Sequence, residues 1–261
     1  MVAQCLEGQA AGWKHFIREY LPFAAAVLDR HFPQPPELRD ATLREALLRA
    51  RDQDDQFFRD YAGHSEREFL LHLREHALAI AEELEPAQAI PEIPLDWEVF
   101  GKALEQWSAL ERQIVWTFVL GPMTDDTAQI LRQAPKSVEA TLAKAQESLR
   151  AACDRWNPEM IAQNRRLLAE QARAGRTSDC AAPKTFLRLL DGQLTWRDRT
   201  DLERHMTACW HCVDLLCRFR EIVFLTRQAR PFPEPEVEAC SKLLGIETQH
   251  PSRWKRLLGK G

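Results

Sequence analysis

The sequence predicts an all-α protein, and two observations indicate this fold class. Apolar residues recur at intervals of three and four along almost the whole chain, which is the spacing of one face of a helix. No stretch alternates apolar and polar residues over the length of a strand. With 261 residues, the chain is long enough for two or three small helical domains.

Residues 1–90 are expected to form the first helical domain. Its first stretch, 13–32, ends before the prolines of PQPPE (33–37), and its apolar stripe consists of Trp13, Phe16, Ile17, Tyr20 and Leu21. A second helical stretch covers 41–61. A third begins at Ser65, which with Glu68 makes a capping box. Pro91 and Pro94 then mark a linker, which we assign to 91–97.

Residues 98–156 are expected to form a second, smaller domain. Two short helical stretches, 97–108 and 109–120, come first, and Gly121 with Pro122 ends the latter. The break RQAP (132–135) then separates a short helix from a longer one that begins near Lys136. Two helices joined by such a turn suggest a helix-turn-helix, although a simple packed bundle would give the same pattern.

The rest of the chain divides into a helical connector (157–175), a region with a cysteine and histidine motif (176–230) and a tail (231–261) that is rich in proline and ends basic. The motif RHMTACWHC places His205, Cys209 and Cys212 at H-x3-C-x2-C spacing. His205 and Cys209 are four residues apart and project from one helix face, and Cys212 can reach the same point as the helix ends. This pattern is suited to a metal ion.

Charge and cysteine content narrow the class of protein. Residues 1–150 hold 16 Lys and Arg against 25 Asp and Glu, whereas 151–261 hold 19 against 14. An acidic front half argues against broad nucleic-acid binding there, and the opposite charges would let the two halves attract each other. Seven cysteines in a chain without an export signal favour free thiols or metal ligands over disulfides. Without an apolar run of membrane-spanning length, we expect a cytoplasmic protein that does not bind the membrane.

The front of the chain resembles an extracytoplasmic-function (ECF) sigma factor of bacterial RNA polymerase. LEGQAAGWKHFIREYLPFAAAVLDRHF (6–32) resembles the opening helix of sigma region 2, and REFLLHLREHALAIA (67–81) resembles a later helix of the same domain. Residues 104–150 resemble sigma region 4, with Ala128, Ile130, Leu131, Ser137, Val138 and Leu142 at the expected helix-turn-helix positions. The resemblance implies binding to the polymerase core and to promoter DNA, with DNA contacts from Lys136, Ser137, Thr141 and Lys144.

Residues 176–230 are similar to the zinc-binding anti-sigma domain. That family shows an upstream Cys or His and a YLDGEL-like turn before H-x3-C-x2-C, and here Cys180 and LLDGQL (189–194) fall in the same order. Thr195 and Asp198 make a capping-box start for the helix that carries His205. The resemblance therefore implies a zinc site of four ligands, Cys180, His205, Cys209 and Cys212.

A Cys3His set is closed, which is typical of structural zinc and leaves no position for a catalytic water. The alternatives are unmetallated thiols on a packed helix, or a redox switch in which oxidation of the thiolates releases the metal.

We therefore expect a transcription initiation regulator rather than an enzyme. In this hypothesis the C-terminal module packs on the chain's own sigma-like half, or on a partner sigma domain, and masks it. The rival hypothesis is a sigma-like protein that only binds other proteins, because Glu139, Thr141 and Gln146 stand where the family often has Lys or Arg. A third interpretation, a metalloprotease, would need HLREH (72–76) to bind zinc, although no partner glutamate helix is evident.

Overall fold

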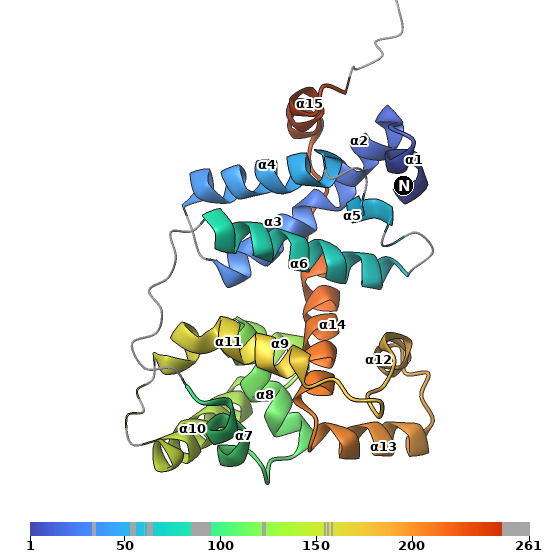
Figure 1. Ribbon diagram of the computed structural model, residues 1–261. Helices are drawn as coiled ribbons and strands as arrows, with labels where there is room; N and C mark the ends of the chain where they lie inside the picture. The colour runs from blue at the N-terminus through green and yellow to red at the C-terminus, as the bar shows by residue number, and fades with distance from the viewer. Residues whose placement is uncertain are drawn as a thin grey trace, which may run out of the picture. The chain divides into compact units, whose positions relative to one another are not determined.

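The computed structural model describes residues 1–32, 35–52, 56–59, 61, 65–84, 95–121, 124–153, 155, 157 and 159–246. Within these ranges the chain is helical without any strand, which confirms the predicted fold class (Figure 1). The chain divides into two compact units. Unit 1 comprises Met1–Asp29, Gln34–Ile80 and Ala229–Gly261, and unit 2 comprises Arg30–Pro33 and Ala81–Gln228.

Unit 1 is built around a core of aromatic side chains. Its helices are α1 (Val2–Leu6), α2 (Ala10–Glu19), most of α3 (Leu21–His31), α4 (Pro36–Asp52), α5 (Gln56–Arg59), most of α6 (Glu66–Leu84) and α15 (Glu234–Leu243). The predicted stripe forms part of that core, with Trp13, Phe16 and Ile17 buried. The predicted capping box is present at α6, where Ser65 N donates to Glu68 Oε2 at 3.0 Å and Glu68 N donates to Ser65 Oγ at 3.3 Å.

Helix α15 comes from the tail and packs against α2 within unit 1. Val237, Ser241 and Leu244 form its buried stripe. Just before the helix, Phe232 N donates to the carbonyl of Arg18 at 3.0 Å, and the Arg18 guanidinium pairs with Glu234. This helix was not predicted, although acids in its first turn and Pro235 are helix-start signals. The basic end of the predicted tail, 247–261, lies outside the described residues.

Unit 2 contains the remaining helices, among them the two that were expected to form a helix-turn-helix. They are α7 (Trp97–Ala103), α8 (Ala109–Leu120), α9 (Thr124–Leu131), α10 (Pro135–Ala152), α11 (Met160–Ala174), α12 (Pro183–Leu190), α13 (Trp196–Met206) and α14 (Trp210–Gln228). Residues 132–134 make the turn between α9 and α10, where Arg132 adopts a positive φ of 54°. Of the predicted linker 91–97, residues 91–94 lie outside the described residues, and Asp96 caps α7 by accepting from Glu98 N at 2.7 Å.

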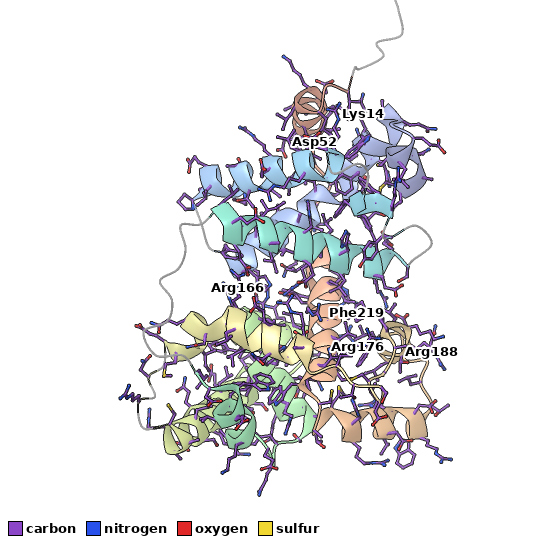
Figure 2. All side chains as sticks on the ribbon, viewed as in Figure 1. Lys14, Asp52, Arg166, Arg176, Arg188 and Phe219 are labelled. Atoms are coloured by element: carbon purple, nitrogen blue, oxygen red, sulfur yellow. The ribbon has the colours of Figure 1, made fainter. Side chains whose placement is uncertain are left out.

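Helix α14 holds unit 2 together. It packs against α8, α9, α11, α12 and α13, which surround it in Figure 1. Phe219, labelled in Figure 2, lies midway along α14 and is fully buried. The predicted connector, which is helix α11, also packs on α8 and α14. Helix α14 therefore packs both on α8 and α9 and on α12 and α13 of the cysteine and histidine region.

A buried ion network lies at the end of α3, within unit 2. Arg30 donates from Nε to Glu221 Oε1 and from Nη1 to Asp126 Oδ2, each at 2.7 Å. Its Nη2 also lies 3.3 Å from the carbonyl oxygens of Thr117 and Gly121. These partners come from α8, α9 and α14, so one guanidinium satisfies acids and carbonyls from three helices.

Candidate metal centre

Two turns and two helices deliver the four predicted ligands. Cys180 lies in the turn before α12, His205 lies in the last turn of α13, and Cys212 lies in the first turn of α14. Cys209 lies in the turn between α13 and α14, where its N–H donates to the carbonyl of His205 at 3.0 Å. Of the capping box predicted at the start of α13, one hydrogen bond is present, in which the Thr195 hydroxyl accepts from Asp198 N at 3.2 Å.

One detail of the predicted motif was wrong. His205 and Cys209 were expected on one helix, with Cys212 where that helix ends, but α13 ends at Met206 and a new helix begins at Trp210. The hydrogen bond from Cys209 N to His205 O preserves the four-residue geometry across the break. Cys212 therefore lies at a helix start, and its backbone N–H is one of the groups that lower the pKa of Cys209.

The structure brings all four side chains to one point. One ligand atom from each of Cys180, His205, Cys209 and Cys212 lies within 4.8 Å of every other. The sulfurs of Cys180 and Cys209 are 3.6 Å apart. A tetrahedral zinc with Zn–S bonds near 2.3 Å requires S···S distances of about 3.8 Å, so the two sulfurs are already close to the spacing that zinc needs.

The histidine nitrogen at this point has an unmet bonding requirement. His205 Nε2 is buried and has no hydrogen-bond partner in the described part of the chain. Buried polar atoms are nearly always satisfied, and each exception needs an explanation such as an ion. An unpaired imidazole nitrogen beside three sulfurs is the donor set of a structural zinc site, so the residues present fit that metal.

Hydrogen bonding within the cluster stabilises one thiolate. A hydrogen bond from the Cys212 side chain, opposed by burial, is the largest cause that lowers the pKa of Cys209 to about 4. The same bond, together with burial, raises the pKa of Cys212. Because zinc binds thiolates rather than thiols, the site holds one ligand ready in its binding form at neutral pH.

Neighbouring groups orient the ligands. Thr177 N donates to the sulfur of Cys180 at 3.2 Å, which positions the ligand most distant in sequence. On the other side, the Arg112 guanidinium lies 4.7 Å from the ring centroid of Trp210, between Cys209 and Cys212 in sequence. Trp210 in turn contacts Trp97, Phe100 and Trp116, so the turn that carries Cys209 is anchored in the aromatic core of unit 2.

No family model, curated protein or solved structure matches the chain at a significant level. The candidate metal centre therefore rests on its own four residues, and the sigma-like and anti-sigma-like resemblances stay predictions.

The residues predicted to contact DNA all lie on α10, but they differ in exposure and in their bonding partners. Lys136 and Ser137 are exposed in its first turn. Thr141 is half-buried, and its hydroxyl donates to the carbonyl of Ser137 at 2.9 Å. Lys144 donates to Glu111 at 2.8 Å and lies 4.5 Å from the ring centroid of Trp107. DNA contact by these residues stays a prediction. To contact DNA, Lys144 would have to leave Glu111 and Trp107.

The HLREH residues are engaged in packing. His72 stacks on Phe57 and Tyr61, with ring centroids 4.6 and 4.1 Å apart. His76 Nε2 donates to the carbonyl of Ala46 at 3.0 Å. Across the described ranges, the Cys3His cluster is the one group of three or more potential ligands close enough to share an ion.

A search of the same residues for membrane-spanning segments gave a negative result. None of the described helices combines the length and the apolar character needed to cross a bilayer.

Proposed function

We propose that the protein is a transcription regulator in which sigma-factor-like helices are covered by a C-terminal part with a structural zinc site. The observation that carries this proposal is where the C-terminal helices pack. Helix α15 lies against α2 in unit 1, the region-2-like segment, and α14 lies against α8 and α9 in unit 2, the region-4-like segment. Surfaces covered in this way are closed to a second protein, which supports masking of polymerase-binding helices.

The metal would have a scaffolding role in this proposal. Cys180, His205, Cys209 and Cys212 would hold zinc as a closed tetrahedral set, and the bound ion would supply folding free energy. The chain's own contribution is to bring α12, α13 and the start of α14 together, so that α14 can extend into the helix-turn-helix core. Because all four positions are filled by side chains, the proposal assigns no hydrolytic chemistry to the site.

The masking proposal is tested by releasing α15 in the full-length chain. Val237 and Leu244 are fully buried, so Val237→Glu with Leu244→Glu should detach the helix, and exposed Glu238→Gln is the control. We expect the double variant to retain core RNA polymerase in a pull-down at least tenfold better than the wild type and the control. Equal retention by all three proteins would contradict the proposal.

A deletion experiment must leave the hydrophobic core of unit 2 intact. Removing residues 176–261 would delete α14, whose Leu216, Phe219 and Ile222 are buried in that core, and loss of binding would then report misfolding. Ending the chain at Gln228 removes residues 229–261, which include α15 and the basic tail, and keeps unit 2 complete. This truncation should reproduce the effect of the double variant.

A second candidate function is a regulator that binds proteins but not DNA. The observation that favours it is the exposed surface of α10, where Glu139 and Glu147 accompany Lys136 and Arg150 and where Lys144 is paired with Glu111, so the surface is close to neutral. Binding of a random pool of DNA duplexes to the complex with core polymerase separates the two candidates. If α10 contacts phosphates, Lys136→Gln should reduce the salt dependence of binding by roughly one charge. If the variant and wild type bind equally at every salt concentration, the second candidate is preferred.

A further inference from the structure

Unit 1 contains a surface groove of about 640 Å³ between α15 on one side and α3 and α4 on the other. Helix α15 lines it with Glu236, Ala239, Cys240 and Leu243, whose spacing is that of one helix face. This face differs from the one that buries Val237, Ser241 and Leu244. The helix therefore has one apolar stripe packed in the core and a second one left open to the groove.

The floor of the groove is apolar. Leu21 and Ala25 of α3 and Leu43 and Leu47 of α4 line it, each pair four residues apart on its helix. Opposite them, Leu243 of α15 is 42% exposed, one of the few large apolar side chains left so open in the described part of the chain. The floor leucines are already buried, so an apolar body that lies on them would cover mainly Leu243.

The rim of the groove carries a surplus of positive charge. Arg39 is neutralised by Asp40 at 3.1 Å and by Asp29 at 3.3 Å. Arg44 and Lys242 are exposed and form no ion pair with any carboxylate of the described residues, which leaves Glu236 as the one remaining acid of the lining. Burial and the charge of Glu236 raise the pKa of Cys240, and the charge of Arg44 acts against that rise.

We propose that this groove binds an amphiphilic anion of small-molecule size. Its volume lies in the range of roughly 300–1,000 Å³ typical of small-molecule sites, which are mainly apolar with a few polar groups that orient the ligand. The apolar body of the ligand would lie on Leu43, Leu47 and Leu243. Its acidic head would pair with Arg44 and Lys242, one from each wall.

The position of α15 gives such a ligand a regulatory effect. Because the ligand contacts both walls, it binds only while α15 is docked, and it stabilises the docked state by mass action. This consequence rests on the proposed masking function, whereas ligand binding does not. An amphiphilic anion would then keep the sigma-like helices covered.

Cys240 provides a direct readout of occupancy in the full-length protein. Octanoate serves as the probe, octan-1-ol as its uncharged counterpart, and alkylation of each cysteine by iodoacetamide is followed by peptide mass spectrometry. We expect octanoate to slow the alkylation of Cys240 at least threefold and saturably, with no change at Cys153, a half-buried cysteine of unit 2. Octan-1-ol should need about a tenfold higher concentration for the same protection, because it lacks the ion pairs.

Matched variants separate the groove from nonspecific binding. Ala239→Trp should fill the groove and abolish protection, whereas Glu238→Trp places the same ring on the exposed side of α15 and should leave protection intact. Arg44→Gln with Lys242→Gln should remove the difference between octanoate and octan-1-ol. Absence of saturable protection, or equal protection in both tryptophan variants, would overturn the proposal. If Cys240 is protected but octanoate leaves polymerase retention unchanged, the ligand site stands and its regulatory effect is wrong.

Discussion

The indole Nε1–H of Trp116 donates to Asp214 Oδ1 across 2.9 Å, and both side chains are buried. The bond joins α8 to α14, two helices from parts of the sequence expected to form separate domains. The same carboxylate pairs with Arg218 at 2.6 Å, one turn further along α14. A buried carboxylate requires such partners, so the contact between α8 and α14 is polar and specific as well as apolar.

Replacing Trp116 with Phe tests how much this hydrogen bond contributes to the free energy of unfolding. The variant leaves one oxygen of Asp214 without its donor and removes part of a buried ring, so we expect the free energy of unfolding to fall by about 2–3 kcal/mol. Urea unfolding followed by circular dichroism measures the change. Trp196→Phe is the matched control, because Trp196 is 81% exposed and its loss should cost no more than about 0.5 kcal/mol. Similar losses in both variants would show that the buried bond contributes nothing specific.

The metal centre predicts different outcomes for two neighbouring histidines. His205→Ala removes a ligand and should reduce zinc content from about one ion per chain to less than a tenth of that, measured by mass spectrometry of metals after dialysis. His211→Ala should retain the metal, because that ring lies outside the cluster with Nδ1 3.1 Å from the carbonyl of Arg173. Equal zinc content in both variants would exclude His205 as a ligand.

Replacing each of two glycines with alanine should change the stability of the fold in opposite directions. A Cβ at Gly121 would lie 2.9 Å from the buried guanidinium of Arg30, so Gly121→Ala should displace that ion network and cost about 1–3 kcal/mol. At Gly101, inside α7, a Cβ meets nothing within 4 Å, and Gly101→Ala should raise stability by up to about 1 kcal/mol through helix propensity. Thermal unfolding of the two variants compares them. A neutral Gly121→Ala would mean that Arg30 has room to move.

The capping box of α8 predicts a stability change at acidic pH. Glu111 accepts from Lys144, which is the main cause that lowers its pKa from 4.5 to about 2, and from the backbone and hydroxyl of Ser108. The folded pKa lies below the unfolded one, so the stabilisation is complete above about pH 4.5 and is lost as the pH falls towards 2. Glu111→Gln should cost roughly 0.5–1 kcal/mol at pH 7, as expected for an exposed cap and ion pair.

Urea unfolding between pH 7 and pH 2.5 measures this dependence. The gap between wild type and Glu111→Gln should narrow as the pH falls below 4.5. Glu147→Gln changes an exposed carboxylate on α10 and provides the control, with a small difference expected at every pH. A gap that stays constant with pH would show that the charge of Glu111 has no part in the effect.

Local features could be predicted from the sequence because neighbouring residues decide them. The break between α9 and α10 follows from the RQAP stretch, and the start of α6 follows from Ser65 and Glu68. Three residues of the candidate metal centre were identifiable from their H-x3-C-x2-C spacing, and Cys180 was identifiable from the resemblance to the anti-sigma domain. These predictions depend on contacts a few residues apart or on a known motif.

The long-range packing could not be predicted in the same way. Nothing near Arg30 in the sequence indicates that it would pair with Glu221, 191 positions away, or with Asp126. The contact of α15 with α2 likewise depends on which of several amphipathic faces meet, and periodicity alone leaves that choice open. The second apolar stripe of α15 could be recognised only from the structure, because the sequence does not tell which face of the helix is buried.

Helix α14 carries Cys212 in its first turn and, three turns later, Phe224, which packs against the helix-turn-helix core of Ile114, Ile130 and Val138. If zinc binds at the beginning of this helix, the metal site and the packing of α9 and α10 at its far end share one unfolding equilibrium. A chelator would act as a denaturant of α9 and α10 without touching them. The availability of zinc in the cell would then set how much of the chain has a formed helix-turn-helix.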